Sequence, residues 1–239
     1  MLVFVCFDLK RMLKIAVYIA LSAAALVLII SLTQKNDSED AFISASEYTL
    51  VIDAGHGGID GGAVSASGIK ESDINLAVAL KTEAIAELLG ISTVMTRSDG
   101  SDSSGNTPYS ERGDLLYRAE LADRTDNAVL ISIHQNTFPS ELVSGAEVMY
   151  AATDGSELLG NITQSALVAC ADPDNRRLAR PAPKELLLTS SVHCPAILVE
   201  CGFLSNPDEA AKLADNGYQM KLAAVFAASF LRFSQNMTV

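Results

Sequence analysis

The spacing of hydrophobic and polar residues changes along this chain between the two-residue repeat of strands and the three-to-four-residue repeat of helices. Short apolar runs ended by glycine or polar residues predict strands at 48–53, 92–96, 128–133, 145–151, 185–189 and 195–199. Apolar residues at helical spacing predict helices at 74–88, 111–122, 156–170, 207–214 and 218–233, with Ser110 as the N-cap of the second. Strands that alternate with helices indicate an α/β fold: a single domain with a mostly parallel, twisted sheet flanked by helices.

Three ionisable residues fall at or just beyond the ends of predicted strands. His56 follows the first strand in a glycine-rich turn, His134 follows the strand at 128–133, and Glu200 follows the strand at 195–199. In parallel sheets, ligands bind beyond the carboxyl ends of the strands. We therefore expect these three side chains to converge on one site.

The first 33 residues differ in composition from the rest of the chain. Residues 15–32 contain no charged side chain, and this length is near the lower limit for a helix that crosses a bilayer. Basic residues precede the segment at Lys10, Arg11 and Lys14, and such a flank favours a cytoplasmic N-terminus. We predict a cytoplasmic tail and signal-anchor transmembrane helix over 1–33, a polar tether over 34–46, and a globular domain over 47–239 that lies outside the cytoplasmic membrane.

Two other interpretations of the apolar segment stay open. Cleavage as a signal peptide would give a secreted protein, although Ile43-Ser44-Ala45 offers only a poor cleavage site. A buried helix of a soluble domain would carry a polar stripe, which residues 15–32 lack. The length of the apolar run favours an uncleaved anchor.

The chain beyond residue 35 is strongly acidic. Of the 17 basic and 29 acidic residues in the whole sequence, four and one lie in residues 1–35, which leaves a net charge of −15 for the remainder. A surface this acidic repels a phosphate backbone, and no basic stripe or repeated aromatic pattern compensates for it. The composition therefore argues against nucleic acid as a partner.

Two histidines and two glutamates carry the candidate chemistry: His56, Glu71, His134 and Glu200. Two imidazoles and one carboxylate make a three-ligand zinc site with an open fourth position. A second carboxylate that is not a ligand supplies what metal-assisted hydrolysis requires. The residue types predict a zinc hydrolase with one zinc ion per chain.

Each of these residues also has an ordinary structural explanation. A histidine at a strand end can simply be a hydrogen-bonded structural residue, and an acid such as Glu71 at the start of a helix interacts favourably with the helix dipole. Glu200 follows five uncharged residues, where a carboxylate is unfavourable unless it is paired or functional, and a structural ion pair would also satisfy it. Two histidines at strand ends beside glycine turns favour ligation over these alternatives.

Four motifs surround these residues in a fixed order. They are GHGG at 55–58, Lys70-Glu71, SIHQN at 132–136 and VECGFLSNP at 199–207. With them the chain resembles the zinc-dependent N-acetylmuramoyl-L-alanine amidases, from about residue 48 to about residue 233. Four ordered motifs make this resemblance far more specific than any one of them alone.

The resemblance implies a role for each motif residue. His56, Glu71 and His134 would bind the zinc ion, and Glu200 would be the catalytic acid/base that takes a proton from zinc-activated water and returns one to the leaving nitrogen. The implied substrate is peptidoglycan, cleaved at the amide bond between N-acetylmuramic acid and L-alanine. Two positions depart from the usual family pattern, Ala54 in place of proline and Gln135 in place of alanine, and neither is a ligand.

Within the family, the chain is most similar to the small membrane-anchored amidases that mature the spore cortex. The similarity rests on its size, the single apolar N-terminal segment, and the segments PYSERGDLLYRAEL at 108–121 and SGAEVMY at 144–150. It implies a role in forming muramic-δ-lactam together with a separate deacetylase. It also leaves room for a protein activator that the sequence does not name.

Polar residues outside the motifs are candidates for substrate binding. Arg176, Arg177 and Arg180 concentrate positive charge in an acidic domain and predict a clamp for the carboxylates of a stem peptide, although a solvated loop explains them equally well. Asn136 either shapes the turn after its strand or touches the substrate.

Two other functions remain as alternatives to the amidase. A zinc peptidase that cuts within the stem peptide would use the same metal chemistry. A non-catalytic wall-binding or regulatory protein would share the scaffold, but such relatives tend to lose a ligand or the acid/base, and all four residues are present here.

Overall fold

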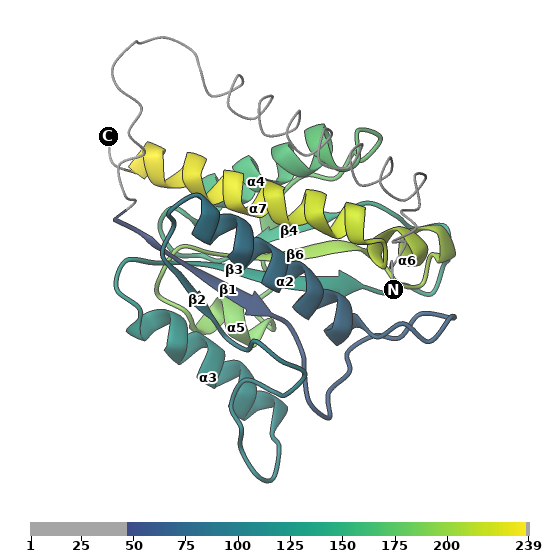
Figure 1. Ribbon diagram of the computed structural model, residues 1–239, viewed down its shortest axis with the longest axis horizontal. Coiled ribbons are helices and arrows are strands. Elements are labelled where there is room, and N and C mark those ends of the chain that lie inside the picture. The colour runs from purple at the N-terminus through teal and green to yellow at the C-terminus, as the bar shows by residue number, and fades with distance from the viewer. Residues whose placement is uncertain (1–46, 238–239) are drawn as a thin grey trace, which may run out of the picture. The chain divides into compact units, whose positions relative to one another are not determined.

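The structure, a computed structural model, describes residues 47–237 as one α/β domain built on a six-stranded sheet (Figure 1). The predicted N-terminal tail, signal-anchor helix and tether all lie outside the described residues. None of the helices between residues 47 and 237 has the length and apolar character that a bilayer crossing needs. The α/β class and the single layered domain predicted from the sequence are confirmed.

The sheet is mixed, with strand order β2-β1-β3-β6-β4-β5. Strands β1, β2, β3 and β6 run parallel to one another, and β4 runs antiparallel to β6 and parallel to β5. Only a loop connects β3 to β4, and without a crossover helix the chain must return in the opposite direction. The bounds are Thr49–Ala54 (β1), Thr93–Met95 (β2), Ala128–Asn136 (β3), Glu147–Tyr150 (β4), Arg180–Pro181 (β5) and Ala196–Phe203 (β6).

Helices cover both faces of the sheet (Figure 1). Helices α2, α4 and α7 lie on one face, and α3 and the short α5 lie on the other. Ser110 caps α3 as predicted by accepting a hydrogen bond from the backbone N–H of Gly113. The bounds are Glu71–Leu88 (α2), Glu111–Arg124 (α3), Ser156–Cys170 (α4), Leu187–Ser191 (α5), Pro207–Leu213 (α6) and Asn216–Met237 (α7).

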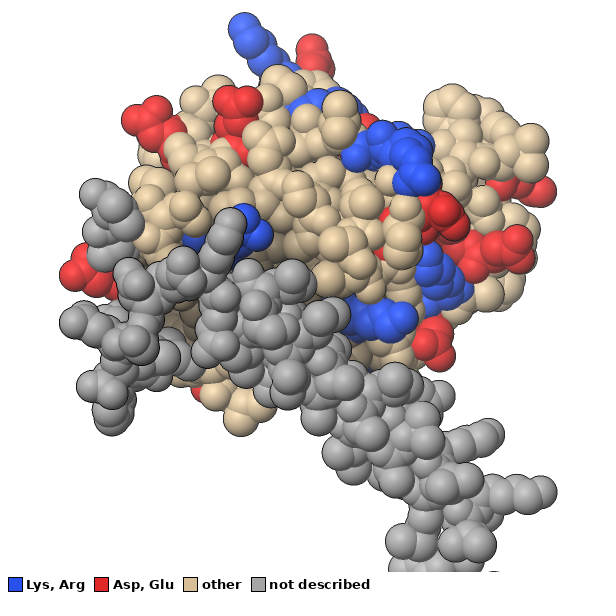
Figure 2. Space-filling view, turned by 90° about the horizontal axis from the view of Figure 1, so that it is seen from above, with Lys and Arg blue, Asp and Glu red and all other residues tan. Residues whose placement is uncertain are grey.

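Two apolar cores result, one on each face of the sheet. Leu50 and Ile52 of β1 point into the larger core, and Val51 between them points into the smaller one beneath α3 and α5. Because both faces are buried, the central strands are continuous apolar runs and do not alternate with polar residues. On the face seen in Figure 2, basic and acidic side chains are interspersed mainly on the right of the view, and uncharged residues cover much of the rest of the visible described surface.

The structure corrects three of the predicted elements. The segment predicted as a strand at 185–189 forms helix α5, because a short apolar run does not distinguish a strand from one turn of helix. Strand β5 contains only two residues and has no pattern to detect. Strands β3 and β6 continue past their predicted ends, so His134 and Glu200 lie within strands and not beyond them.

Candidate metal centre

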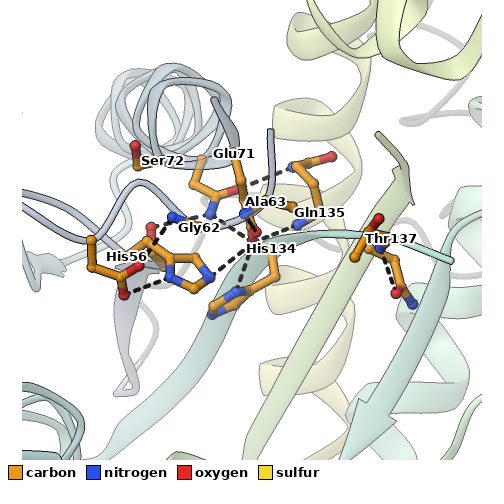
Figure 3. Close-up of polar contacts among 12 residues, drawn as sticks. His56, Gly62, Ala63, Glu71, Ser72, His134, Gln135 and Thr137 are labelled. Atoms are coloured by element: carbon orange, nitrogen blue, oxygen red, sulfur yellow. Dashed lines mark hydrogen bonds and ion pairs between the residues drawn. The ribbon is translucent and has the colours of Figure 1, made fainter. Parts of the chain in front are cut away.

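Three side chains from three different elements meet at the carboxyl ends of the central strands (Figure 3). His56 comes from the turn after β1, Glu71 is the first residue of α2, and His134 lies near the end of β3. The Oε1 atom of Glu71 lies 3.2 Å from Nε2 of His56 and 3.0 Å from Nδ1 of His134. One donor atom from each residue lies within 4.8 Å of the others.

These donor atoms fit a small divalent cation. Bonds of about 2.0–2.1 Å to a tetrahedral zinc ion separate neighbouring donors by about 3.3 Å. The two nitrogen–oxygen separations at Glu71, 3.2 and 3.0 Å, are close to that value. The donor set of two imidazoles and one carboxylate, with the rings facing one another edge to face, leaves a fourth position open. The sequence-predicted trio is therefore brought together in a form that could hold a metal ion.

Glycines in the turn after β1 make this approach sterically feasible. A Cβ atom on Gly55 would lie 2.3 Å from the imidazole ring of His134, closer than any side chain tolerates. Gly62 has a φ of +63°, and a Cβ there would lie 2.6 Å from Oε2 of Glu71. His56 itself has a φ of +60°, so the turn holds a non-glycine residue in the left-handed region. The GHGG motif thus reflects close packing around the three donor groups.

A carboxylate behind His56 orients its ring. The Nδ1 atom of His56 lies 2.7 Å from Oδ2 of Asp60, which leaves Nε2 facing Glu71. The hydroxyl of Tyr109 also donates to Oδ2 of Asp60, over 3.3 Å. Burial alone would lower the pKa of His56, but the hydrogen bonds and negative charges of Glu71 and Asp60 outweigh burial and raise this pKa to about 9.

Glu71 is buried with both carboxylate oxygens satisfied. Its Oε1 accepts hydrogen bonds from the backbone N–H of Gln135 at 3.0 Å and from the Asn75 amide at 3.3 Å, and its Oε2 accepts one from the N–H of Ala63 at 2.9 Å. Burial would raise the pKa of this carboxyl, but the hydrogen bonds and charges of the two histidines hold it well below its usual range. Glu71 is therefore fixed as an anion.

A buried ionic network supports the strand end from the other face of β1. Arg118 of α3 is 1% exposed and pairs with Asp53 at 2.6 Å and with Asp114 at 2.7 Å. It also donates to the carbonyls of Ala54 and His56, each at 2.7 Å. Asp53 accepts further hydrogen bonds from the hydroxyls of Ser132 and Thr96. The turn that carries His56 is thus braced by charged groups.

The sequence interpretation missed this supporting layer. Asp60, Asn75 and Arg118 bond directly to a donor residue, Arg97 bonds to the backbone beside two of them, and Asp53 pairs with Arg118; none of the five was singled out. One signal was available: Asp53 and Arg97 stand directly after apolar strand runs, where a charged residue needs a partner. Most of the partners lie 40 or more residues away, so the sequence does not reveal them.

Glu200 lies beside this trio, on the neighbouring strand. It is directly opposite His134 in the parallel pairing of β3 with β6. Its Oε2 atom is buried and has no hydrogen-bond partner among the described residues. Burial raises the pKa of Glu200 to about 7. Two smaller effects act in opposite directions: the charge of His134 lowers this pKa, and the charge of Glu71 raises it.

Of the three arginines predicted to bind substrate, two pair with a neighbour of Glu200 and one bonds to nearby backbone. Glu147 of β4 is opposite Glu200 on its other side, and Arg177 and Arg180 pair with the Glu147 carboxylate at 3.4 and 3.0 Å. Arg177 also stacks on the ring of Phe203, 4.8 Å from its centroid. Two of the predicted arginines therefore contact Glu147, the residue next to Glu200 on the neighbouring strand.

The two remaining predicted substrate residues bond to nearby backbone. Arg176 donates to the carbonyls of Pro173 and Asn175. The side chain of Asn136 accepts from the N–H of Thr137 at 2.7 Å and so shapes the end of β3. Whether Asn136 also contacts substrate stays a prediction.

Comparisons with known proteins agree with this arrangement. The sequence model described as N-acetylmuramoyl-L-alanine amidase matches residues 50–231. The germination-specific N-acetylmuramoyl-L-alanine amidase of Bacillus subtilis is 34% identical over 205 residues, covering 83% of this chain and 85% of that protein.

Solved structures give the same result. The CwlD amidase of Clostridioides difficile, solved in complex with the GerS lipoprotein, has a TM-score of 0.73 and 32% identity over 79% of this chain and 99% of that one. The amidase AmiC2 of Nostoc punctiforme has a TM-score of 0.68 and 31% identity over 80% of this chain and 99% of that one.

Proposed function

The chain belongs to the N-acetylmuramoyl-L-alanine amidase family, and from that premise we propose that it hydrolyses peptidoglycan with one zinc ion held by His56, Glu71 and His134. The bond cleaved is the amide between the lactyl group of N-acetylmuramic acid and L-alanine. The observation that carries the proposal is a tight cluster of three donor atoms beside a carboxylate with one buried oxygen, Oε2 of Glu200, that has no hydrogen-bond partner within residues 47–237. A structural ion pair would not leave that carboxylate oxygen unsatisfied.

Zinc, when bound, supplies a Lewis acid that polarises the scissile carbonyl and lowers the pKa of water to about 7. Glu200 acts as the general base and takes a proton from the water that attacks the lactyl carbonyl carbon. As the carbon–nitrogen bond breaks, the same carboxyl returns the proton to the alanine nitrogen, which leaves as a free amine. Glu71 keeps its charge throughout, because its two oxygens are held by backbone and side-chain donors.

The substrate side of the site is formed by Glu147, which lies next to Glu200 on the neighbouring strand, and by the two arginines that pair with it. Arg177 and Arg180 exceed Glu147 by one positive charge, and Arg180 keeps 45% of its side chain exposed. A stem-peptide carboxylate would find there a planar guanidinium that can bind it in bidentate fashion. Arg176 and Asn136 complete the proposed contacts, with a smaller expected share because each already bonds to backbone groups.

The biological role follows from the relatives. Because a relative is named for germination, we place this amidase in spore-cortex maturation, where it would remove stem peptides before muramic-δ-lactam forms. A solved relative is complexed with a lipoprotein, which supports a protein activator for this chain too. The predicted signal-anchor over 1–33 and tether over 34–46 would hold the catalytic domain, 47–239, at the outer surface of the cytoplasmic membrane; cleavage would instead release it as a secreted enzyme.

Digestion of purified peptidoglycan by the full-length chain tests the function. We expect mass spectrometry to detect stem peptides with a free N-terminal alanine, and we expect a zinc chelator to stop their release. Shortened peptides still attached to muramic acid would identify a zinc peptidase instead. Binding to the wall material without any product, with or without added zinc, would favour a non-catalytic wall protein.

A further inference from the structure

Arg97, two residues past the end of β2, is a buried cation whose three guanidinium nitrogens each donate to backbone carbonyls. The whole residue is 5% exposed. The Nε atom donates to Ala54 O at 2.8 Å, and Nη1 donates to Asp99 O at 2.7 Å. The Nη2 atom donates to Gly55 O at 3.1 Å and to Ser72 O at 2.8 Å. One rigid group therefore joins four points of the backbone.

Three of those points belong to the two segments that carry His56 and Glu71, and the fourth, Asp99, belongs to the loop of Arg97 itself. Ala54 and Gly55 form the turn immediately before His56, and Ser72 immediately follows Glu71 in the first turn of α2. The planar guanidinium holds its donors at fixed angles, so it also fixes the distance between the turn and the helix. A change in either contact would move one donor residue relative to the other.

The charge of Arg97 distinguishes it from the other buried arginine. Arg118 is paired with Asp53 and Asp114 and contacts the turn but not α2. No carboxylate among residues 47–237 forms an ion pair with Arg97. The charges of Asp53, Asp114 and Asp73 act on Arg97 only from beyond ion-pair distance. A buried cation that bonds only to carbonyls is unfavourable for stability, and an apolar side chain would fill the space without that penalty. An arginine at position 97 is explained if the site requires the planar, forked geometry of its guanidinium donors.

The turn also makes room for this guanidinium. A Cβ atom on Gly57, which has a φ of +136°, would lie 2.9 Å from Nε of Arg97. Asn75 provides a second link between the segments, since its amide donates to Gly55 O at 3.1 Å and to Glu71 Oε1 at 3.3 Å. The second link is weaker, because a neutral amide holds carbonyls less strongly than a guanidinium does.

We infer that Arg97 is a positioning residue that sets the spacing of His56 and Glu71 and thereby the affinity of the site for a divalent cation. The inference rests on the proposed metal site. Arg97 touches neither the cation nor the substrate, and acts only through the backbone of residues 54, 55 and 72. Removing it should weaken metal binding without abolishing it, because Asn75 keeps the two segments linked.

Zinc affinity of the full-length chain tests this role. Competition with a chromogenic chelator would compare wild type with Arg97→Met and Arg97→Lys, well below the unfolding temperature of each. We expect Arg97→Met to lose about 10–100-fold in zinc affinity, as for outer-shell partners generally, with its circular dichroism unchanged. Arg97→Lys should fall between it and wild type, because an ammonium group keeps the charge but cannot reach all the carbonyls. The matched control is Arg124→Met, an exposed arginine on α3, which should bind zinc as wild type does.

Other outcomes separate the failure of this inference from the failure of the proposed function. Wild-type zinc affinity in folded Arg97→Met would overturn the positioning role while leaving the metal site intact. Failure of both variants to fold would also overturn it, by assigning Arg97 to the fold and not to ligand spacing. Absence of stoichiometric zinc in the wild type, with no difference from His56→Ala, would instead remove the proposed metal site on which the inference rests.

Discussion

Two glutamates of the same site, Glu71 and Glu200, have opposite environments. Glu71 has every oxygen bonded, and two histidines hold its pKa well below the usual range. Glu200 has one buried oxygen with no partner in the described part of the chain, and burial raises its pKa to about 7. Pairs of titratable groups whose environments separate their pKa values identify the permanent charge and the proton carrier. The contrast therefore divides the site into a ligand side and a proton-transfer side.

The residues that surround the two glutamates show the same division into a ligand side and a proton-transfer side. On the ligand side, the turn after β1 is braced by Arg97 and Arg118, which are almost fully buried. On the proton-transfer side, Glu147 pairs with Arg177 and Arg180, whose side chains remain 29% and 45% exposed. A metal site benefits from fixed donors, whereas the substrate must enter and leave. The rigid half and the accessible half serve these separate requirements.

Replacing each glutamate by glutamine gives the largest expected effect. Glu200→Gln should lower turnover of peptidoglycan by about 10²–10⁴-fold, the usual contribution of a general acid/base, and keep one zinc ion per chain. Glu71→Gln should lose both zinc and activity, because an amide is a poorer ligand than a carboxylate. Metal analysis of the purified variants, beside product release, checks both. Loss of zinc in Glu200→Gln would make Glu200 a ligand and end the contrast.

Asp53→Asn should produce the next largest effect, on stability. Removing one partner leaves the buried Arg118 charge poorly compensated, and we expect the free energy of unfolding to fall by about 3–5 kcal/mol. Chemical denaturation at pH 7 measures this loss. The exposed pair of Glu120 with Arg124 provides the control, and Glu120→Gln should change stability by less than about 0.5 kcal/mol.

The same variant has a defined pH dependence. Burial opposes ionisation of Asp53, but the charge of Arg118, the charge of His134 and the hydroxyls of Ser132 and Thr96 lower its pKa in the folded protein. A lowered folded-state pKa adds stability that is complete above the unfolded value, about 3.9, and is lost as the pH falls through the folded value. The difference in stability between wild type and Asp53→Asn should therefore shrink below about pH 4. A difference that stays constant down to pH 2 would show that the ionised form of Asp53 contributes nothing.

The layered fold was predictable because its signal is local. Apolar runs of β1 and β3 and the helical repeat of α2 each appear within one short stretch of sequence, and the residues at strand ends follow from the parallel order. The convergence of His56, His134 and Glu200 depended only on that order. The strand β4 was predicted at 145–151, but its antiparallel direction was not, because that direction depends on the lack of a crossover helix after β3.

The supporting charges were not predictable, because their partners are distant in sequence. Arg118 meets Asp53 across 65 residues, and Arg97 reaches Ala54 across 43. In the sequence, Arg118 looks like an ordinary charge on a helix, and the position of Arg97 after a strand indicates that it needs a partner but not which one. The ion pairs of Arg177 and Arg180 were missed for the same reason, because Glu147 lies 30 or more residues before them. Periodicity identifies what is buried but not which charges meet.

Gly55→Ala tests the packing of the ligand side and should have a smaller effect. The added methyl group would overlap the His134 ring, so the ring or the turn must move. We expect a loss of about 1–3 kcal/mol in stability and weaker zinc binding, measured by thermal unfolding with and without zinc. Gly100→Ala is the matched control, because nothing lies within 4 Å of its Cβ position. Equal behaviour of the two variants would mean that the turn adapts without displacing His134.

Glu147→Gln tests the proton-transfer side and should have the smallest effect. The negative charge of Glu147 contributes to the raised pKa of Glu200, so its removal should lower that pKa. The base is then deprotonated at lower pH, and the acid limb of kcat/KM should move to lower pH by roughly half a unit. Arg177→Met removes a compensating positive charge and should move the same limb to higher pH. Shifts in the same direction for both variants would show that charge at Glu147 does not act on Glu200, and the two halves of the site would then differ in packing alone.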